Sequence, residues 1–195
     1  MKEERYEIRF AGSGGQGIVF AAIVLAEAAG IRDGRHVCQT QSYGPEARGG
    51  TSQADVVISK KPIDYPRATK LDLLLAMNQA ACDTYFSDLK PEGLLVVDAS
   101  LVHQIPTNRA VAIPFSQIAQ REVGEKLASN MVALGAVSHL TKAASPKALE
   151  YALAARAPKG TEETNRKAFR AGIKAARNVD LKSLPSTIKG EEEEV

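Results

Sequence analysis

The segment GSGGQG, from Gly12 to Gly17, constrains the fold of this chain more than any other feature. It follows a strand-like run over residues 6–10 and precedes a helix-like run over residues 16–29. Glycines at the first, third and sixth positions of such a turn are typical of phosphate binding at a helix N-terminus. In that arrangement Gly12 permits the tight turn, Gly14 lets a ligand approach the backbone, and Gly17 lets the helix pack on the strand. The chain is therefore expected to begin with a strand, a glycine turn and a helix.

Strand-like and helix-like runs continue to alternate along the first two-thirds of the sequence. The expected strands are residues 6–10, 36–43, 53–59, 71–76, 94–98 and 110–115, and the expected helices are 16–29 and 79–88, with a turn at 90–93. This rhythm predicts a three-layer α/β/α sandwich with a mostly parallel, Rossmann-like central sheet. The short loop after residue 43 also permits a hairpin-like return, which would make the sheet mixed.

The last third of the chain is predicted to be helical. Asn130 can cap a helix over residues 131–142, whose apolar residues surround it on nearly all sides. Such a helix is buried either in its own core or beneath a partner. Thr161 can cap a further helix. We predict one domain over residues 1–183 and an acidic, flexible tail over residues 184–195, which ends in EEEEV.

A second motif, SYGPEARGG, follows the second expected strand. It places Tyr43, Glu46 and Arg48 close together in the chain. Arg48, followed by Gly49 and Gly50, could clamp a carboxylate or phosphate with two hydrogen bonds. Glu46 could hold Arg48 in place or take part in proton transfer. An arginine–glutamate pair that only braces an exposed loop is equally compatible with these residues.

The end of the second expected strand argues against a stand-alone nicotinamide site. A dinucleotide-binding domain places an acidic residue there to bind the ribose. This chain has Gln39, Gln41 and Ser42 instead. The glycine turn can therefore bind a phosphate-type group, or it can serve only for packing and for the approach of a neighbouring chain.

The composition excludes several other classes of function. The net charge of +2 comes from scattered residues, which argues against nucleic-acid and membrane-surface partners. The longest apolar run, residues 18–29, contains Glu27 and is too short to cross a membrane. The chain has two cysteines, too few for an iron–sulfur cluster of the usual four-cysteine kind. Without a secretion signal, they favour a cytoplasmic location.

Isolated polar residues give weaker indications. His36, His103 and His139 lack further ligands at metal-binding spacing, so packing or surface roles are favoured for all three. Asp98 ends an expected strand and Ser100 follows it. Ligands often bind at that position, but capping of the following turn explains Asp98 equally well.

Four segments, taken in order, resemble a known family. They are GSGGQGIVFAAIVLAEAA, QTQSYGPEARGGTSQADVVIS, VVDASLV and NMVALGA. They resemble the gamma subunit of 2-oxoacid:ferredoxin oxidoreductases, and the similarity extends from about residue 6 to about residue 177. The form QSYGPEARGG is most similar to the 2-oxoglutarate type. The central motif is far more specific than the glycine pattern alone.

The resemblance implies a division of labour within a multi-subunit enzyme. Enzymes of this family decarboxylate a 2-oxoacid oxidatively, transfer the acyl group to coenzyme A and pass electrons to ferredoxin. Thiamine diphosphate and iron–sulfur clusters are expected in partner alpha, beta or delta subunits, and no cofactor is expected on this chain alone. The family motifs point to a first group of binding residues, Gly12, Gly14, Gly15, Gln16 and Gly17, and to a second group, Tyr43, Glu46, Arg48 and Gly49.

The resemblance assigns no catalytic residue to this chain. Two other functions stay open at this point. One is an independent dinucleotide-dependent oxidoreductase, and the other is a binding module without a redox complex.

Overall fold

The computed structural model describes residues 4–43 and 51–185. Its centre is a six-stranded sheet in the order β2-β3-β1-β4-β5-β6. The strands are β1 (Arg5–Ser13), β2 (His36–Tyr43), β3 (Thr51–Ser59), β4 (Leu71–Ala76), β5 (Leu89–Asp98) and β6 (Ala110–Ile113). Neighbours from β1 to β6 run parallel, whereas β3 is antiparallel to both β1 and β2. The sheet is therefore mixed, as the short loop after residue 43 permits.

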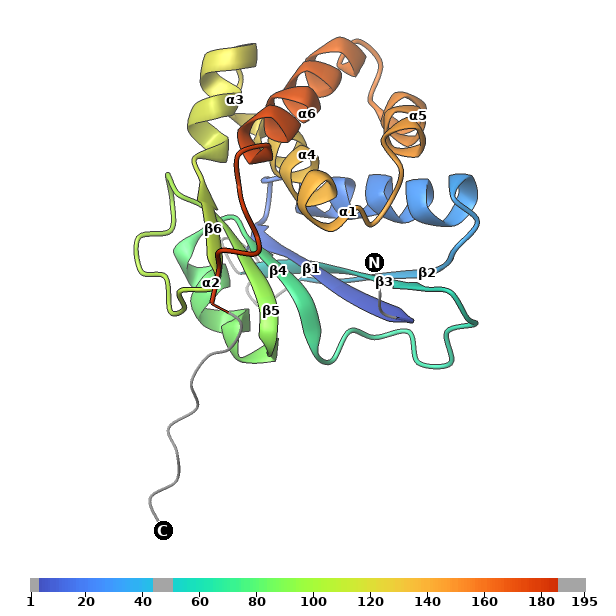
Figure 1. Cartoon of the computed structure of the whole chain (residues 1–195). Helices are drawn as coiled ribbons and strands as arrows, with labels where there is room; N and C mark the ends of the chain where they lie inside the picture. Colours follow the sequence, from blue (N-terminus) through green and yellow to red (C-terminus); the bar gives the residue numbers. More distant parts are fainter. Residues whose placement is uncertain (1–3, 44–50, 186–195) are drawn as a thin grey trace.

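The helices cover the two faces of the sheet unequally. They are α1 (Ile18–Glu27), α2 (Gln79–Tyr85), α3 (Phe115–Val123), α4 (Ser129–Thr141), α5 (Pro146–Arg156) and α6 (Glu162–Ala176). Figure 1 shows α2 on one face and the other labelled helices on the opposite face. The predicted three-layer α/β fold is confirmed, with one layer much thinner than the other. Within the described residues, no helix is long and apolar enough to cross a membrane.

The residues of β4 show why its sequence, LDLLLA, is nearly all apolar. Leu73 and Leu75 belong to the larger hydrophobic core, beneath α1 and α4. Leu74 and Ala76 belong to a smaller core on the α2 face. Both faces of β4 are thus covered, and a strand buried on both sides needs apolar residues at consecutive positions.

A close crossing of α4 and α6 holds the thick helical layer together. A Cβ atom on Gly135 would lie 2.0 Å from the carbonyl oxygen of Phe169, and one on Gly172 would lie 1.8 Å from that of Val132. The two backbones can approach this closely only because both positions are glycine. Residues 129–138 of α4 are buried within this chain, so the helix needs no partner subunit to cover it.

Arg9 of β1 forms a buried ionic group on the thinner face. Its guanidinium donates to both carboxylate oxygens of Asp55, at 2.7 and 3.0 Å, and also to Asp88. The ring of Tyr85 lies 5.1 Å from the same guanidinium. Arg9 and Asp55 are direct neighbours across β1 and β3. The bond to Asp88 joins this strand pair to the segment that follows α2.

Four expectations for single segments were wrong. Residues 90–93 lie within β5, where Leu89 pairs with Leu71 and Leu94 with Leu73. The predicted turn is therefore a bulge in a strand, a position that tolerates Pro91. The first helix does not end at residue 29, because a π-helical turn continues it over Ala28–Arg32.

The other two wrong expectations concern helix and strand ends. The helix α4 begins at Ser129, and its N-cap is Ala128 rather than Asn130. Strand β6 ends at Ile113, because Pro114 has no N–H to continue the ladder and instead precedes α3.

Helices α3 and α5 had no counterpart among the expected elements. The pair Ser145–Pro146, a capping residue followed by proline at the first helical position, was the signal for α5. Thr161 does occupy the N-cap position of α6, but its side chain makes no capping hydrogen bond. Leu184 is half-buried against the larger core, and residues 186–195 lie outside the described part of the chain. The proposed domain boundary at residue 183 stays a prediction.

The helix crossing makes a test of the fold. Gly172→Ala is expected to lower the free energy of unfolding by about 1–3 kcal/mol, because the added methyl group forces α4 and α6 apart. Gly14→Ala is the matched control, since a Cβ atom there would meet no atom within 4 Å. Denaturant unfolding measures both effects. Equal losses in the two variants would contradict the close crossing.

Candidate functional site

The glycine turn between β1 and α1 is filled by its own glutamine. The side-chain oxygen of Gln16 accepts a hydrogen bond from the Ser13 backbone N–H at 2.7 Å. The Gln16 Nε2 donates to the carbonyl oxygen of Met77 at 3.2 Å. Met77 follows β4 directly, so this one side chain joins the ends of two neighbouring parallel strands.

The glycines of the turn serve different physical purposes. A Cβ atom on Gly12 would lie 2.5 Å from Gln16 Oε1. Gly17 has a φ of +70°, and a Cβ atom there would lie 2.3 Å from Asn130 Nδ2. Both positions are glycine because parts of this chain approach them closely. Gly14 and Gly15, by contrast, are exposed, and a Cβ atom on either would meet no atom within 4 Å. Only this outer pair leaves backbone open to a ligand or a partner.

Asn78 supports the turn from the adjacent strand. Its Nδ2 donates to Ser13 Oγ at 2.5 Å, and its Oδ1 accepts from the Ala81 N–H at 2.8 Å as the N-cap of α2. The helix α1 leaves β1 toward one face and α2 leaves β4 toward the other (Figure 1). In α/β sheets ligands bind in the crevice where connections diverge in this way, beyond the carboxyl ends of the strands.

The residues that flank positions 44–50 lie at the same edge of the sheet as the glycine turn. Tyr43, the last residue of β2, pairs with Ser52 of β3, and Ser52 in turn pairs with Gly12. The hydroxyl of Ser52 donates to the Gly12 carbonyl oxygen at 3.3 Å. The start of the second motif is therefore one strand removed from the glycine turn. Glu46, Arg48 and Gly49, and the rest of residues 44–50, lie outside the described part of the chain.

A hollow of about 590 Å³ adjoins the exposed side of the turn. Two of its apolar residues are notably exposed, Leu101 at 40% and Leu127 at 66%. Arg121 and Lys126 supply positive charge beside them. The hollow is lined by Gly15, Gln16, Ser100, Leu101, Ser116, Gln117, Gln120, Arg121, Lys126, Leu127 and Ser129.

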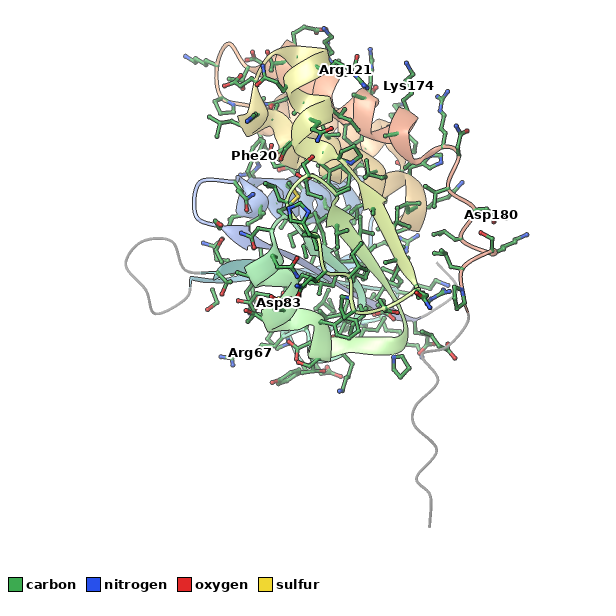
Figure 2. The ribbon with its side chains drawn as sticks, turned by 90° about the vertical axis from the view of Figure 1, so that its left-hand side faces the viewer. Phe20, Arg67, Asp83, Arg121, Lys174 and Asp180 are labelled. Carbon is green, nitrogen blue, oxygen red and sulfur yellow. The ribbon has the colours of Figure 1, made fainter. Side chains whose placement is uncertain are left out.

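Figure 2 shows Arg121 and Phe20 on the helix-rich side of the sheet and Asp83 on the opposite side.

The chemistry of this edge favours binding over bond-making. Its described side chains offer amides, hydroxyls, leucines and two cations. The nearby carboxylate, Asp98, is fully buried and accepts hydrogen bonds from Ser100 N and from both the N–H and hydroxyl of Ser116. Of the two interpretations left open for Asp98, the structure supports capping.

The histidines and cysteines form no common site. His36 and His103 are exposed, and His139 lies at the far end of α4. Within the described residues, no group of three or more His, Cys, Asp or Glu side chains could hold a metal ion. Cys82 is buried against the α2 face, and burial raises the pKa of its thiol, which makes it a poor nucleophile.

The strand order gives a structural reason against an independent dinucleotide site. In the dinucleotide-binding fold the second strand runs parallel beside the first and presents the ribose-binding carboxylate. Here the antiparallel strand β3 separates β2 from β1. The end of β2 is thereby displaced by one strand spacing, about 4.8 Å. Its residues Gln41 and Ser42 carry no carboxylate.

Several asparagine and glutamine contacts of the site join residues far apart in the chain. Gln16 was among the expected site residues, because it belongs to the GSGGQG motif. Asn78 and Asn130 were not, since nothing local in the sequence connects them to the turn. Asn130 Nδ2 donates to the Gly17 carbonyl oxygen at 3.0 Å, which fixes the start of α4 against the start of α1.

Comparisons with known proteins agree with this fold. Residues 7–175 match the family described as pyruvate ferredoxin/flavodoxin oxidoreductase. The chain is 44% identical over 179 residues to the 2-oxoglutarate synthase subunit KorC of Methanocaldococcus jannaschii, covering 90% of this chain and 96% of that protein.

Two solved structures are also similar. The gamma subunit of a keto/oxoacid ferredoxin oxidoreductase from Geobacter sulfurreducens has a TM-score of 0.82 and 45% identity, covering 89% of this chain and 97% of that one. The 2-oxoglutarate:ferredoxin oxidoreductase of Magnetococcus marinus, solved with 2-oxoglutarate, coenzyme A and succinyl-CoA bound, has a TM-score of 0.82 and 27% identity. That match covers 96% of this chain but 33% of the Magnetococcus chain.

The position of Gln16 leads to a second test. Gln16→Leu is expected to lower the free energy of unfolding by about 1–3 kcal/mol, because the Ser13 N–H and the Met77 carbonyl both lose a partner. Gln117→Leu, on the exposed side of α3, is the control and should change stability by less than about 0.5 kcal/mol. Chemical denaturation followed by circular dichroism compares the variants. Equal stability of both would mean that Gln16 does not hold the turn.

Proposed function

The chain belongs to the pyruvate ferredoxin/flavodoxin oxidoreductase family, and from this premise we propose that it is the gamma-type subunit of a 2-oxoglutarate:ferredoxin oxidoreductase. The complex would decarboxylate 2-oxoglutarate oxidatively, form succinyl-CoA and transfer the electrons to ferredoxin. The observation that carries this proposal is the 44% identity to a 2-oxoglutarate synthase subunit of nearly the same length. A fold match at a TM-score of 0.82 to a gamma subunit supports it.

The lengths of the relatives support the role of one component among several. The chain corresponds to almost the whole of the Methanocaldococcus subunit and of the Geobacter gamma subunit. It corresponds to one third of the Magnetococcus chain. We infer that the same fold works either as a separate subunit or as part of a longer polypeptide, and that this chain needs alpha and beta subunits, with a delta subunit in some assemblies.

The residues of this chain do not fit an iron–sulfur cluster. Four cysteine thiolates normally hold such a cluster, and this sequence contains two cysteines. Cys82 is buried, whereas Cys38 is half-buried in β2. We therefore assign the clusters and thiamine diphosphate to partner subunits, with coenzyme A as a cosubstrate of the complex and ferredoxin as its electron acceptor. A cytoplasmic location follows from this assignment and stays a prediction.

We propose that the two motifs form one wall of a site shared with a partner. The exposed backbone of Gly14 and Gly15 supports this role, as does the position of Tyr43 at the same edge. In this proposal Gly14 and Gly15 present the open backbone, Gly12, Gln16 and Gly17 hold them in place, and Tyr43, Glu46, Arg48 and Gly49 complete the wall. Its task is to orient a bound group and exclude water, while the bond-breaking chemistry belongs to the partner.

Reconstitution tests the assignment to a complex. The purified chain is expected to show no 2-oxoglutarate-dependent reduction of a viologen dye. Adding it to its copurified alpha and beta subunits should restore coenzyme A-dependent reduction. A panel that includes pyruvate and 3-methyl-2-oxobutanoate identifies the preferred 2-oxoacid. Activity of the isolated chain would overturn the subunit assignment, and preference for another 2-oxoacid would overturn the assigned substrate.

Arg48 tests the proposed anion clamp. Arg48→Ala should lower the rate of the reconstituted complex or raise the KM for coenzyme A by about tenfold, because a charge-assisted bond to a buried anion contributes about 1.5–3 kcal/mol. Arg67→Ala is the control, since Arg67 is exposed in the segment between β3 and β4, away from the glycine turn (Figure 2). Unchanged rate and coenzyme A dependence in Arg48→Ala would leave Arg48 with a structural role only.

A further inference from the structure

A second cavity, of about 440 Å³, lies at the opposite end of α1 from the glycine turn. The turn that follows α1, the end of α4, the start of α5 and one side of α6 enclose it. Figure 1 shows this end of α1 beside α5. The cavity is lined by Asp33, Arg35, Ser138, His139, Lys142, Ala144, Ser145, Pro146, Leu149, Phe169 and Ile173. The proposed function gives this cavity no task.

The polar side of the cavity carries an excess of positive charge. Arg35 and Lys142 are cationic, and Asp33 is the one carboxylate among the lining residues. Both oxygens of Asp33 are already engaged, because they accept from the N–H and the hydroxyl of Ser145 at 2.6 and 2.7 Å. Asp33 therefore fixes the start of α5, and Arg35 and Lys142 are the cationic residues of the lining, together with His139.

Arg35 faces the cavity with only part of its guanidinium. Its Nη1 atom is buried and has no hydrogen-bond partner among residues 4–43 and 51–185. A ligand in the cavity would therefore bind the other nitrogens of this side chain. The volume lies within the range of small-molecule sites, which is about 300–1,000 Å³.

The helix ends at the cavity do not reverse this preference for an anion. The N-terminus of α5 adds partial positive charge, with Ser145 as its N-cap. The C-terminus of α4 adds partial negative charge, but Lys142 is its C-cap and donates its N–H to the Ser138 carbonyl. The partial charges of the two helix ends have opposite signs and offset each other. The charged side chains therefore determine whether the cavity favours an anion or a cation.

Apolar residues form much of the remaining wall. Leu149 and Phe169 lie beneath its surface, each 1% exposed, and the half-buried Ile173 lies one turn along α6 from Phe169. We propose that this cavity binds a small organic monocarboxylate. Arg35 and Lys142 hold its carboxylate, and its hydrocarbon body lies against Ile173 and over the buried Leu149 and Phe169.

The backbone of Lys142 allows its charge to be tested apart from stability. Lys142 has a φ of +52°, and it is the one non-glycine residue with positive φ among the described residues. Glycine is the favoured residue at this position of a helix end. Lys142→Gly therefore removes the cation and relieves the backbone at the same time. If Lys142 binds the ligand, the variant loses affinity for it but does not lose stability.

Calorimetric titration of the full chain with hexanoate at pH 7 tests the proposal. Saturable binding is expected for the unmodified chain, at least tenfold tighter than binding of the uncharged analogue hexanamide. Arg35→Met should weaken hexanoate binding tenfold or more. Lys142→Gly should weaken it several-fold while the thermal midpoint stays unchanged or rises. Arg67→Met, an exposed arginine in another segment, should leave the affinity unchanged.

Three results would overturn the proposal. They are the absence of saturable hexanoate binding, equal affinity for hexanoate and hexanamide, and full affinity in Lys142→Gly. If Arg35→Met does not fold, the comparison of the two ligands and the Lys142→Gly variant still decide the question. None of these measurements depends on partner subunits, so the outcome is separate from that of the reconstitution.

Discussion

Two hydrogen bonds of the Gln16 side-chain amide hold together the edge of the sheet at the ends of β1 and β4. At the ends of β1 and β4 the chain leaves toward opposite faces of the sheet, which opens a crevice between neighbouring strands. Gln16 closes the inner part of that crevice by bonding to Ser13 on one side and to Met77 on the other. The turn is therefore held by its own sequence, without a ligand. Its outer residues, Gly14 and Gly15, remain as exposed backbone on a rigid support.

The antiparallel strand β3 gives this edge its second distinctive property. Because β3 returns beside β1, its first residues, Thr51 and Ser52, lie next to the end of the glycine turn. In a fully parallel sheet the strand beside β1 would end, rather than begin, next to the glycine turn. The hairpin thus brings the residues on either side of positions 44–50 to the edge that holds GSGGQG, and it displaces the position of a ribose-binding carboxylate. The same topological change therefore has two consequences at this edge.

Much of the fold could be predicted because it rests on local patterns. The continuous apolar run of β4 and the glycine turn before α1 have the same meaning wherever they occur. The bulge in β5 was harder, because Pro91 and Gly93 indicate a turn locally and only the pairing with β4 makes them part of a strand. Burial of Arg9 depends on Asp55 and Asp88, which are distant in the chain. The sequence by itself contains no signal that these three residues meet.

The candidate site was partly predictable for the same reason. Its motifs are local, but the residues that support them are not. Asn130 was expected to cap α4 because asparagine is a common N-cap, and its position next to the helix start was correct to within two residues. Its Nδ2 reaches the Gly17 carbonyl across the fold, while its Oδ1 accepts a hydrogen bond from the Met131 N–H in the first turn of α4. The side chain therefore serves the helix start and a tertiary contact together, and the tertiary part could not be predicted from the local sequence.

The distribution of buried carboxylates bears on what this chain can contribute to catalysis. Glu7, Asp55, Asp72 and Asp98 are the buried carboxylates of the described residues. Each is bound by backbone N–H groups or by cationic side chains, and each of these bonds holds strands or turns together. A carboxylate that acts as a general base must be free to accept a substrate proton. Since these four are committed to the fold, the chain is better suited to orient a bound group by exposed backbone and cations. The glycine turn offers such backbone, because Gly14 and Gly15 are exposed and a Cβ atom on either would meet no atom within 4 Å.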